Sequence, residues 1–407
     1  MTRCRICSGD VQKFLDLGEQ PLSDAFRPAD EIASFTYHLQ MGRCLTCGAV
    51  QQLAEVPREQ MFHADYPYFS SGSSRMREHF RRTAEHLMAE YCGHDGAVVV
   101  EIGCNDGVML EHVARAGLAH LGFEPSASVA EVARSRGVRV TTEFFDADSA
   151  RAHLGSLGAA DVVYAANTMC HLPYLDSVLA GVEEILAPQG VLVFEDPYLG
   201  DVIAKTSFDQ IYDEHFYLFS AQSVSGLACQ HGFELVDVER LPVHGGEVRY
   251  TLARAGARPV RPAVRAMLDA EAASGLGDPA TYVAFAARVT AVRDDLLATL
   301  TRLRDEGREV VGYGATAKSA TVLNLAGIGP DLIDRVYDST PAKQGRLTPG
   351  SGIPVVAADD FASTTADVAV LFAWNHAEEI KTNEAAFEQG GGQWLEYVPE
   401  VRLVGGR

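Results

Sequence analysis

A dense group of ionisable side chains stands within residues 208–220 of the chain. Tyr212, Asp213, Glu214 and His215 follow one another there, with phenylalanines and tyrosines on both sides. An apolar setting with adjoining carboxylates tunes a histidine for proton transfer near neutral pH. Because Asp213, Glu214 and His215 cannot all share one face, we expect at most two of them to act together. The pattern favours a general base at His215, and the alternative is a surface loop with a hydrogen-bonded histidine.

A glycine-containing turn follows a run of β-branched residues that begins at Val98. It contains Glu101, Gly103, Asn105 and Gly107, and a helical pattern begins directly after it. This is the pattern of a buried parallel strand, a tight turn and a helix N-terminus, where open α/β sheets bind ligands. The glycine spacing of dinucleotide binders is absent, and an acid precedes the first glycine. These features favour a cationic cofactor that carries a nucleoside, and S-adenosylmethionine is such a ligand.

Residues suited to an adenosine follow the next two predicted strands. Glu124 ends the strand at 121–123, about twenty residues beyond the turn, where an acid accepts both hydrogen bonds of a ribose diol. Phe144 follows the strand at 138–141 and is placed to stack on adenine. The alternative is an ordinary doubly wound sheet with acids at its strand ends.

Two further strands, at 162–164 and 191–194, continue the parallel series, and both end in polar residues. Asn167 lies just past the first of them, at the same edge of the sheet as the glycine turn, and we assign it to the cofactor site. His171 lies a few residues further on. It is a candidate site residue, although a histidine that caps a helix is the ordinary alternative.

Two CxxC pairs lie near the start of the chain, Cys4 with Cys7 and Cys44 with Cys47. Each pair offers two thiolates at turn spacing, and two such turns close a tetrahedron around zinc. Four thiolates leave no open position, so we predict a structural zinc; a redox motif is the alternative for a single pair. The metal would supply folding energy to a segment with little core of its own.

Residues 63–74 form an aromatic, hydroxyl-rich stretch between the zinc unit and a predicted helix at 76–91. Tyr66 and Tyr68 could line a polar, uncharged ligand such as a sugar, because such loops carry function when a rigid scaffold positions them. The two tyrosines fit packing between domains equally well.

A second strand-turn-helix pattern begins at residue 309, after a linker at 255–262 and an amphipathic helix at 283–304. Gly314, Thr316 and Lys318 lie in its turn. Backbone N–H groups and one ammonium there could hold a diphosphate.

The competing ligand at this turn is NAD, because Asp338 lies where dinucleotide binders keep a ribose acid. Arg346 and Lys343 could add local positive charge for an anionic substrate, or they could be solvated loop cations. Asn375 and His376 are expected in an exposed polar loop.

The composition of the whole chain bounds these interpretations. At 407 residues the chain is long enough for two or three domains. Its net charge of −21 argues against a nucleic-acid partner, and no apolar run approaches the length of a membrane span. The N-terminus has no apolar signal region, so we expect a cytoplasmic protein. The sequence does not determine the oligomeric state, and a monomer is one option.

Six motifs occur in a fixed order along the chain. They are the paired CxxC, Glu-x-Gly-x-Asn-x-Gly at 101–107, Asn-Thr-x-Cys-His at 167–171, Tyr-Asp-Glu-His at 212–215, His-Gly-Gly at 244–246 and Gly-Tyr-Gly-Ala-Thr-Ala-Lys at 312–318. Together they resemble the zinc-containing C-methyltransferases that act on nucleotide-linked 4-keto deoxysugars, in the biosynthesis of branched antibiotic sugars. The resemblance covers essentially the whole chain.

This resemblance implies methyl transfer from S-adenosylmethionine to C3 of a dTDP-linked sugar. It implies that His215 is the base, that Tyr212 and Glu214 are its neighbours, and that His171 and Tyr66 lie close to the sugar. The chemistry is consistent, because a saturated carbon must lose a proton beside a ketone before it can attack a sulfonium. One departure is visible: the family commonly has Ser after His-Gly-Gly, where this chain has Glu247.

We therefore predict an α/β protein of three domains. These are a zinc-binding domain at 1–72, a Rossmann-like methyltransferase domain at 73–252, and a Rossmann-like α/β domain at 253–407 that binds the nucleotide sugar. The substrate is expected between the last two domains, with the first closing over it. Methylation at C5, an O- or N-methyltransferase, and a binding module without catalysis are the alternatives.

Overall fold

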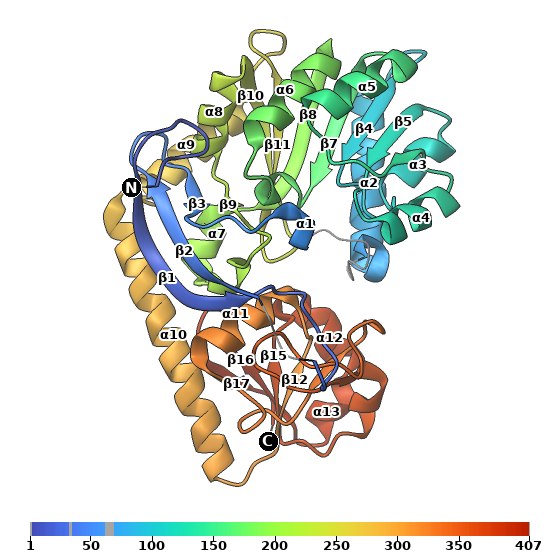
Figure 1. Cartoon of the computed structure of the whole chain (residues 1–407). Coiled ribbons are helices and arrows are strands. Elements are labelled where there is room, and N and C mark those ends of the chain that lie inside the picture. Colours follow the sequence, from blue (N-terminus) through green and yellow to red (C-terminus); the bar gives the residue numbers. More distant parts are fainter. Residues whose placement is uncertain (1, 32–34, 62–68, 407) are drawn as a thin grey trace.

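The computed structural model describes residues 2–31, 35–61 and 69–406, and it shows an α/β protein built on three sheets (Figure 1). A seven-stranded sheet occupies the upper part of the view and a six-stranded sheet the lower part. A four-stranded sheet lies beside the long helix α10 (Pro279–Asp305), which runs along one side of the molecule. With a rise of 1.5 Å per residue, this 27-residue helix is about 40 Å long, so it reaches from one large sheet to the other.

The seven-stranded sheet has the order β10-β11-β8-β7-β4-β5-β6. The strands from β8 to β6 run parallel, and β10 and β11 form an antiparallel pair at the edge. β4 is buried along its whole length, as a β-branched run between helices should be. The strands are β4 Val98–Ile102, β5 Ala119–Phe123, β6 Val140–Thr141, β7 Ala160–Ala166, β8 Leu186–Pro197, β10 Phe233–Leu241 and β11 Glu247–Arg254.

Helices connect these strands and pack against them. Helix α8 begins with a capping box, because the side chains of Ser220 and Ser223 each accept the other's backbone N–H. Helix α9 packs against β10 and α8, so the chain stays with this sheet until α10 begins. The helices are α2 Ser74–Tyr91, α3 Leu110–Arg115, α4 Ala127–Ser135, α5 Ala147–Leu157, α6 Leu175–Ile185, α7 Leu199–Lys205, α8 Ala221–Gln230 and α9 Pro262–Ala273.

The four-stranded sheet joins the N-terminal strands to a distant segment. Its order is β1 (Val11–Pro21), β2 (Thr36–Cys44), β3 (Val50–Gln52) and β9 (Tyr217–Leu218). The short helix α1 (Arg58–Met61) follows β3. Strand β9 belongs to the stretch that contains the predicted base.

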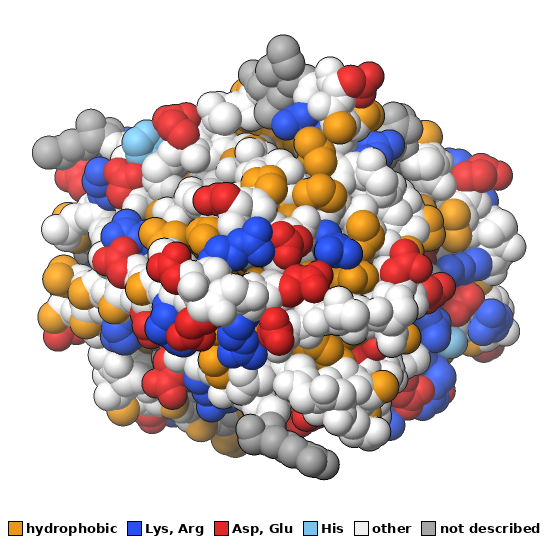
Figure 2. Space-filling view, turned by 90° about the horizontal axis from the view of Figure 1, so that it is seen from below, with side chains coloured by type: hydrophobic (Ala, Val, Ile, Leu, Met, Phe, Trp, Pro, Cys, Tyr) orange, Lys and Arg blue, Asp and Glu red, His pale blue; other side chains and the backbone are white. Residues whose placement is uncertain are grey.

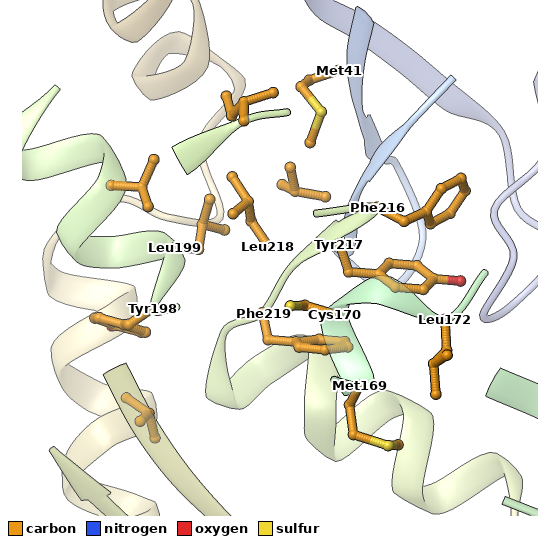
Figure 3. Packing of buried hydrophobic residues seen from close by; sticks show 14 of the residues in the cluster. Met41, Met169, Cys170, Leu172, Tyr198, Leu199, Phe216, Tyr217, Leu218 and Phe219 are labelled. Atoms are coloured by element: carbon orange, nitrogen blue, oxygen red, sulfur yellow. The ribbon is translucent and has the colours of Figure 1, made fainter. Parts of the chain in front are cut away.

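The core is continuous between the four-stranded and seven-stranded sheets. In Figure 3, Met41 of β2 lies near Phe216, Tyr217 and Leu218 around β9, and Cys170, which follows β7 of the seven-stranded sheet, lies beside Phe219. The zinc-binding segment thus buries its apolar face against the methyltransferase domain.

The six-stranded sheet has the order β14-β13-β12-β15-β16-β17, parallel except for the last pair. Its strands are β12 Val310–Tyr313, β13 Val336–Asp338, β14 Val355–Ala357, β15 Val368–Leu371, β16 Gln393–Glu396 and β17 Arg402–Val404. Its helices are α11 Ala317–Ala326, α12 Ala377–Asn383 and α13 Ala385–Gln389.

Residues 22–28, between β1 and β2, cross to the C-terminal domain. The backbone of Arg27 pairs with that of Leu347, and the guanidinium of Arg346 donates to the Phe26 carbonyl at 3.1 Å. Arg346 is exposed and holds two domains together in this way. The N-terminal domain therefore contacts both of the others.

Three local expectations need correction. Residues 255–262 lead directly into α9, a helix not expected from the sequence, and α10 begins at Pro279 rather than at 283. Asn375 and His376 are half-buried in a 3-10 helix, η5 (Trp374–His376), because that turn packs toward the methyltransferase domain.

No helix within the described ranges has the combination of length and apolarity that a membrane span needs. On the face shown in Figure 2, Lys and Arg side chains are mixed with Asp and Glu, and no broad basic area gathers there.

Candidate active site

His215 is buried, with 3% of its surface exposed, and both of its ring nitrogens are hydrogen-bonded. Nδ1 lies 2.7 Å from the carbonyl oxygen of Gln210, and Nε2 lies 2.7 Å from the phenol oxygen of Tyr212. Because a carbonyl only accepts, Nδ1 carries the proton. Burial, and then the charges of His171 and Lys318, lower the pKa of His215 well below its usual range. The imidazole is therefore neutral, with the lone pair of Nε2 facing Tyr212.

The backbone around His215 is held from the N-terminal sheet. The buried amide of Gln52 in β3 donates to the carbonyls of Tyr212 at 2.7 Å and His215 at 2.9 Å. These bonds satisfy carbonyls of an irregular segment that has no complete strand ladder. A 3-10 helix, η3 (Phe208–Gln210), precedes the segment and brings the Gln210 carbonyl to Nδ1. The orientation of the His215 side chain thus depends on contacts with the N-terminal domain.

The two acids before His215 are used differently. Asp213 accepts the backbone N–H of Ser23 at 3.0 Å and so binds the 22–28 segment. Glu214 is 5% exposed. Burial raises the pKa of Tyr212 well above its usual range, and the charge of Glu214 adds to the shift. The Tyr212 phenol therefore keeps its proton and can act as a donor.

A second histidine lies against the first. The rings of His171 and His215 stack with their centroids 5.2 Å apart and their planes at 25°. His171 is in a 3-10 helix, η2 (Met169–His171), just past β7, and burial lowers its pKa to about 3. Both imidazoles are neutral in this site, so either can accept a proton or share a hydrogen bond.

Lys318 reaches the same place from the C-terminal domain. Thr321, one turn later on α11, donates its hydroxyl to the carbonyl of Ile211 at 2.8 Å, and residues three apart share one helix face. Burial lowers the pKa of Lys318, while the charges of Asp209 and Glu247 oppose that effect. The ammonium therefore lies in a desolvated position where the two large domains meet.

Asp209 links the two large domains by hydrogen bonds close to His215. Its fully buried carboxylate accepts hydrogen bonds from Trp374 Nε1 at 2.6 Å and from the Tyr397 hydroxyl at 2.7 Å. His376 of η5 also approaches His244, with ring centroids 6.3 Å apart. Side chains of both domains therefore meet beside His215.

The glycine turn after β4 has the conformation that its residues favour. Gly103, Asn105 and Gly107 have φ values of 68°, 48° and 75°. A Cβ on Gly103 would stand 2.4 Å from the hydroxyl of Thr168, so no side chain fits there. Glu101 is 3% exposed, and its Oε2 accepts no hydrogen bond from any described residue. A buried, unpaired carboxyl oxygen at this turn fits the cationic amino-acid end of S-adenosylmethionine.

Glu124, the predicted ribose acceptor, supports the turn. Its two carboxylate oxygens accept the N–H of Asn105 at 3.1 Å and of Ser126 at 2.8 Å. Burial raises the pKa of Glu124 to about 7. Each oxygen retains a second lone pair for a ribose hydroxyl.

The other predicted cofactor residues lie near the same edge of the sheet. Phe144 is half-buried, and the guanidinium of Arg58 lies 4.1 Å from its ring centroid, so one face of the ring is occupied. Asn167 adopts a φ of 47°, donates its N–H to the Glu195 carbonyl at 2.7 Å and adjoins Glu247.

The four predicted zinc ligands converge. The sulfurs of Cys4 and Cys47 are 3.6 Å apart and those of Cys7 and Cys44 are 3.4 Å apart, and all four lie within 4.8 Å of one another. Tetrahedral bonds of about 2.3 Å to zinc would place sulfurs about 3.8 Å apart, so the cluster fits the ion. A Cβ on the neighbouring Gly9 would stand 2.6 Å from the Thr46 hydroxyl and 3.2 Å from the Cys44 sulfur, so the turn leaves little room for a side chain.

The turn after β12 already uses several of its polar groups. Gly314 has a φ of 89° and donates to a carbonyl of β13, and the Asp338 carboxylate accepts the N–H of Ala315 at 2.7 Å. The Thr316 hydroxyl caps α11. A phosphate there would rely chiefly on Thr316 and Lys318.

Several site residues were not expected from the sequence. Gln210 lies two residues before Tyr212, and its backbone carbonyl fixes the histidine tautomer. Asp209 and Gln52 act through partners far away in the chain, so no local pattern marks them. Tyr66 and Tyr68 lie outside the described residues.

Three family models match successive parts of the chain. They are a zinc binding domain at residues 4–62, a methyltransferase domain at 74–238 and a C-methyltransferase C-terminal domain at 242–399. Together with the sheet order and the four-cysteine cluster, they define a methyltransferase that uses S-adenosylmethionine and carries a structural zinc.

The chain is also 34% identical over 408 residues to the C-methyltransferase NovU of Streptomyces niveus, and the match covers 98% of this chain and 96% of that protein. It therefore belongs to the family of zinc-containing, S-adenosylmethionine-dependent C-methyltransferases.

Solved structures match the chain over less than half of its length. A methyltransferase from Anabaena variabilis is 15% identical with a TM-score of 0.34, and the match covers 43% of this chain and 84% of that one. Magnesium protoporphyrin IX methyltransferase of Synechocystis, with bound SAH, is 14% identical with a TM-score of 0.34 and covers 44% and 83%.

Proposed function

We propose that the protein methylates C3 of a dTDP-linked 4-keto deoxysugar during the biosynthesis of a branched antibiotic sugar. The observation that carries this proposal is the neutral His215, buried between a phenol, a second imidazole and the ammonium of Lys318. A methyltransferase that acts on oxygen or nitrogen has less need of such a base, because those atoms already carry a lone pair.

His215 would take the C3 proton on Nε2, because Gln210 keeps the proton of Nδ1 in place. The electron pair of the C–H bond then moves to the neighbouring C4 ketone and forms an enolate. Tyr212 donates its hydroxyl to Nε2, and it can turn that hydroxyl toward the enolate oxygen when Nε2 faces the substrate. S-adenosylmethionine supplies the methyl group to the carbanion carbon.

The remaining side chains would hold the reactants. The proposed cofactor-binding residues are Glu101, Gly103, Asn105, Gly107, Glu124, Phe144 and Asn167. Glu214 and His171 would adjoin the sugar with Tyr66 and Tyr68, and Gly314, Thr316, Lys318 and Arg346 would serve the nucleotide diphosphate. The anomeric carbon that bears the diphosphate is only two bonds from C3, which agrees with a phosphate contact at Lys318 so close to His215.

The decisive experiment incubates the protein with a panel of dTDP-4-keto sugars in deuterium oxide, with S-adenosylhomocysteine in place of the methyl donor. We expect one deuterium to enter at C3, located by NMR, and one methyl group to be added when S-adenosylmethionine is present. Methylation without any prior C–H exchange would favour transfer to oxygen or nitrogen. Exchange at C5 would move the reaction to the other side of the same ketone.

A further inference from the structure

Glu247 is a buried acid that the mechanism above does not use. It is 1% exposed at the start of β11, and neither of its carboxyl oxygens accepts a hydrogen bond of ordinary geometry from the described part of the chain. An unsatisfied buried carboxyl costs free energy, so a group in this state needs an explanation.

Comparable acids in the same fold are satisfied. Glu195 accepts from Arg249 at 2.7 Å and from His79 at 2.6 Å. Glu271 accepts the N–H of Ala221 at 2.6 Å and another at 2.9 Å from the next residue. These two carboxylates have partners at ordinary hydrogen-bond distance, whereas both oxygens of Glu247 lack such a bond within the described residues and only the side chain of Asn167 adjoins them.

The register of β11 places Glu247 at the ligand-binding edge of the sheet. It pairs with Pro197, the last residue of β8, and its side chain shares a face with Arg249 because side chains alternate along a strand. Arg249 lies deeper on that face and is already bound to Glu195. Glu247 is therefore the outermost residue of this face of β11.

Groups from three other elements surround this position. The side chain of Asn167, past β7, adjoins Glu247. The carboxylate charge of Glu247, when present, raises the pKa of His79 in α2 and of Lys318 in α11. Lys318 is near enough for this interaction but is not in an ion pair with Glu247. The carboxyl thus stands between the predicted cofactor site and Lys318 of the C-terminal domain.

We propose that Glu247 is the receptor for a protonated amine that a ligand brings to this edge of the sheet. Two ligands can bring one: the cofactor, through its α-ammonium group, and an acceptor sugar that carries an amino substituent. A carboxylate is the natural partner of either, because a charge-assisted hydrogen bond in a buried site is about twice as strong as a neutral one. The second source rests on the proposed function, whereas the first does not.

The proposal has a proton balance that can be measured. Burial raises the pKa of Glu247 to about 8, so the carboxyl of the free protein holds its proton at pH 7. When an ammonium group binds, the carboxyl becomes a carboxylate and its proton passes to solvent. Binding should therefore release close to one proton at pH 7.

The first arm of the test uses S-adenosylhomocysteine, which has the same α-ammonium group, in calorimetric titrations at pH 7 in buffers of different ionisation enthalpy. If the cofactor supplies the amine, the parent protein releases a proton, and Glu247→Gln loses that release and binds roughly 10- to 100-fold more weakly. Glu271→Gln is the matched control, because it changes a buried acid that is already paired, and its proton release should match the parent.

The second arm compares dTDP-4-keto sugars that carry an amino or a hydroxyl group at C3, with the cofactor saturating. If the acceptor supplies the amine, Glu247→Gln and Glu247→Ser lower kcat/KM for the amino sugar roughly 10- to 100-fold and leave the hydroxy sugar little changed. Proton release then accompanies binding of the amino sugar alone.

Unchanged proton release and affinity in Glu247→Gln in both arms would overturn the proposal. If neither sugar is methylated by the parent protein, the proposed function fails, while the first arm and direct titration of the amino sugar still decide the role of Glu247. Glu247→Ser provides a second reading if the glutamine variant does not fold.

Discussion

The phenol oxygen of Tyr212 lies 2.7 Å from Nε2 of His215, and the Gln210 carbonyl holds the opposite nitrogen of the same ring at 2.7 Å. This pair fixes both the tautomer and the direction of the imidazole before any substrate arrives. A base that is already oriented loses little entropy when the reaction begins.

His215→Asn should reduce methyl transfer by roughly 10²–10⁴-fold, because the variant lacks the atom that takes the proton. Deuterium exchange at the sugar carbon should fall by the same factor, and affinity for S-adenosylhomocysteine should stay near that of the parent. Tyr212→Phe is the companion variant, which keeps the ring but removes the donor, and it should retain more exchange than the asparagine variant. A cofactor-affinity loss as the main effect of His215→Asn would contradict the role.

The pH profile should show the lowered pKa of His215. The neutral imidazole is the active form, and burial shifts its protonation well below the usual range. With the cofactor saturating and a sugar that carries no amino group, we therefore expect kcat/KM to stay level as the pH falls through 6.5 and to decline only at lower pH. A decline centred at 6.5 would mean that an exposed histidine, not His215, controls the rate.

Glu124→Ala should weaken S-adenosylhomocysteine binding by at least about tenfold, because it removes the predicted ribose acceptor and the support for the Asn105 N–H. Titration calorimetry measures this directly. The substitution Glu131→Ala, at an exposed acid on the neighbouring helix α4, is the control and should bind normally. Normal affinity in Glu124→Ala would remove the ribose assignment.

Loss of zinc should lower activity although the metal takes no part in the reaction. Cys47→Ser removes one ligand, and the protein should lose most of its zinc and unfold at a lower temperature. Methyl transfer should fall because β3 pairs with β9 and Gln52 of β3 holds the base segment. Cys229→Ser, at an exposed cysteine, should keep zinc and activity, as measured by metal analysis and turnover.

Glu247 should make stability depend on pH. Its pKa is about 8 in the folded protein and near 4.5 when exposed, so the folded state holds a proton between these values that the unfolded state has lost. Stability from this group therefore falls as the pH rises from about 4.5 to 8. Glu247→Gln should remove that loss, and its melting temperature relative to the parent should rise by a few degrees between pH 6 and 8. A constant difference would contradict the raised pKa.

The sequence allowed the sheet of the methyltransferase domain to be predicted because its signals are local. The β-branched run into Gly103 and the serines that cap α8 each specify structure within a few residues. The zinc site could be predicted from the paired cysteines in the same way, because two CxxC turns supply the four ligands of a tetrahedral metal site.

The support for the active site could not be predicted in the same way. Gln52 and Tyr212 are 160 residues apart, and Asp209 and Tyr397 are 188 apart. No periodicity or turn signal encodes such pairs, because they form only when separate domains pack. Two-residue β9 gives no pattern of its own for the same reason.

The pairing of β3 with β9 also bears on how such proteins can be recombined. An N-terminal module transferred from a relative would have to pair with the β9 of another protein. Its counterpart of Gln52 would have to bond to backbone carbonyls of that protein. A chimera should therefore take residues 208–220 from the same parent as the N-terminal module that binds them. The N-terminal module expressed by itself would lack β9, one strand of its sheet. Segments that contact each other in this fold are then expected to be exchanged together, even when they lie far apart in the gene.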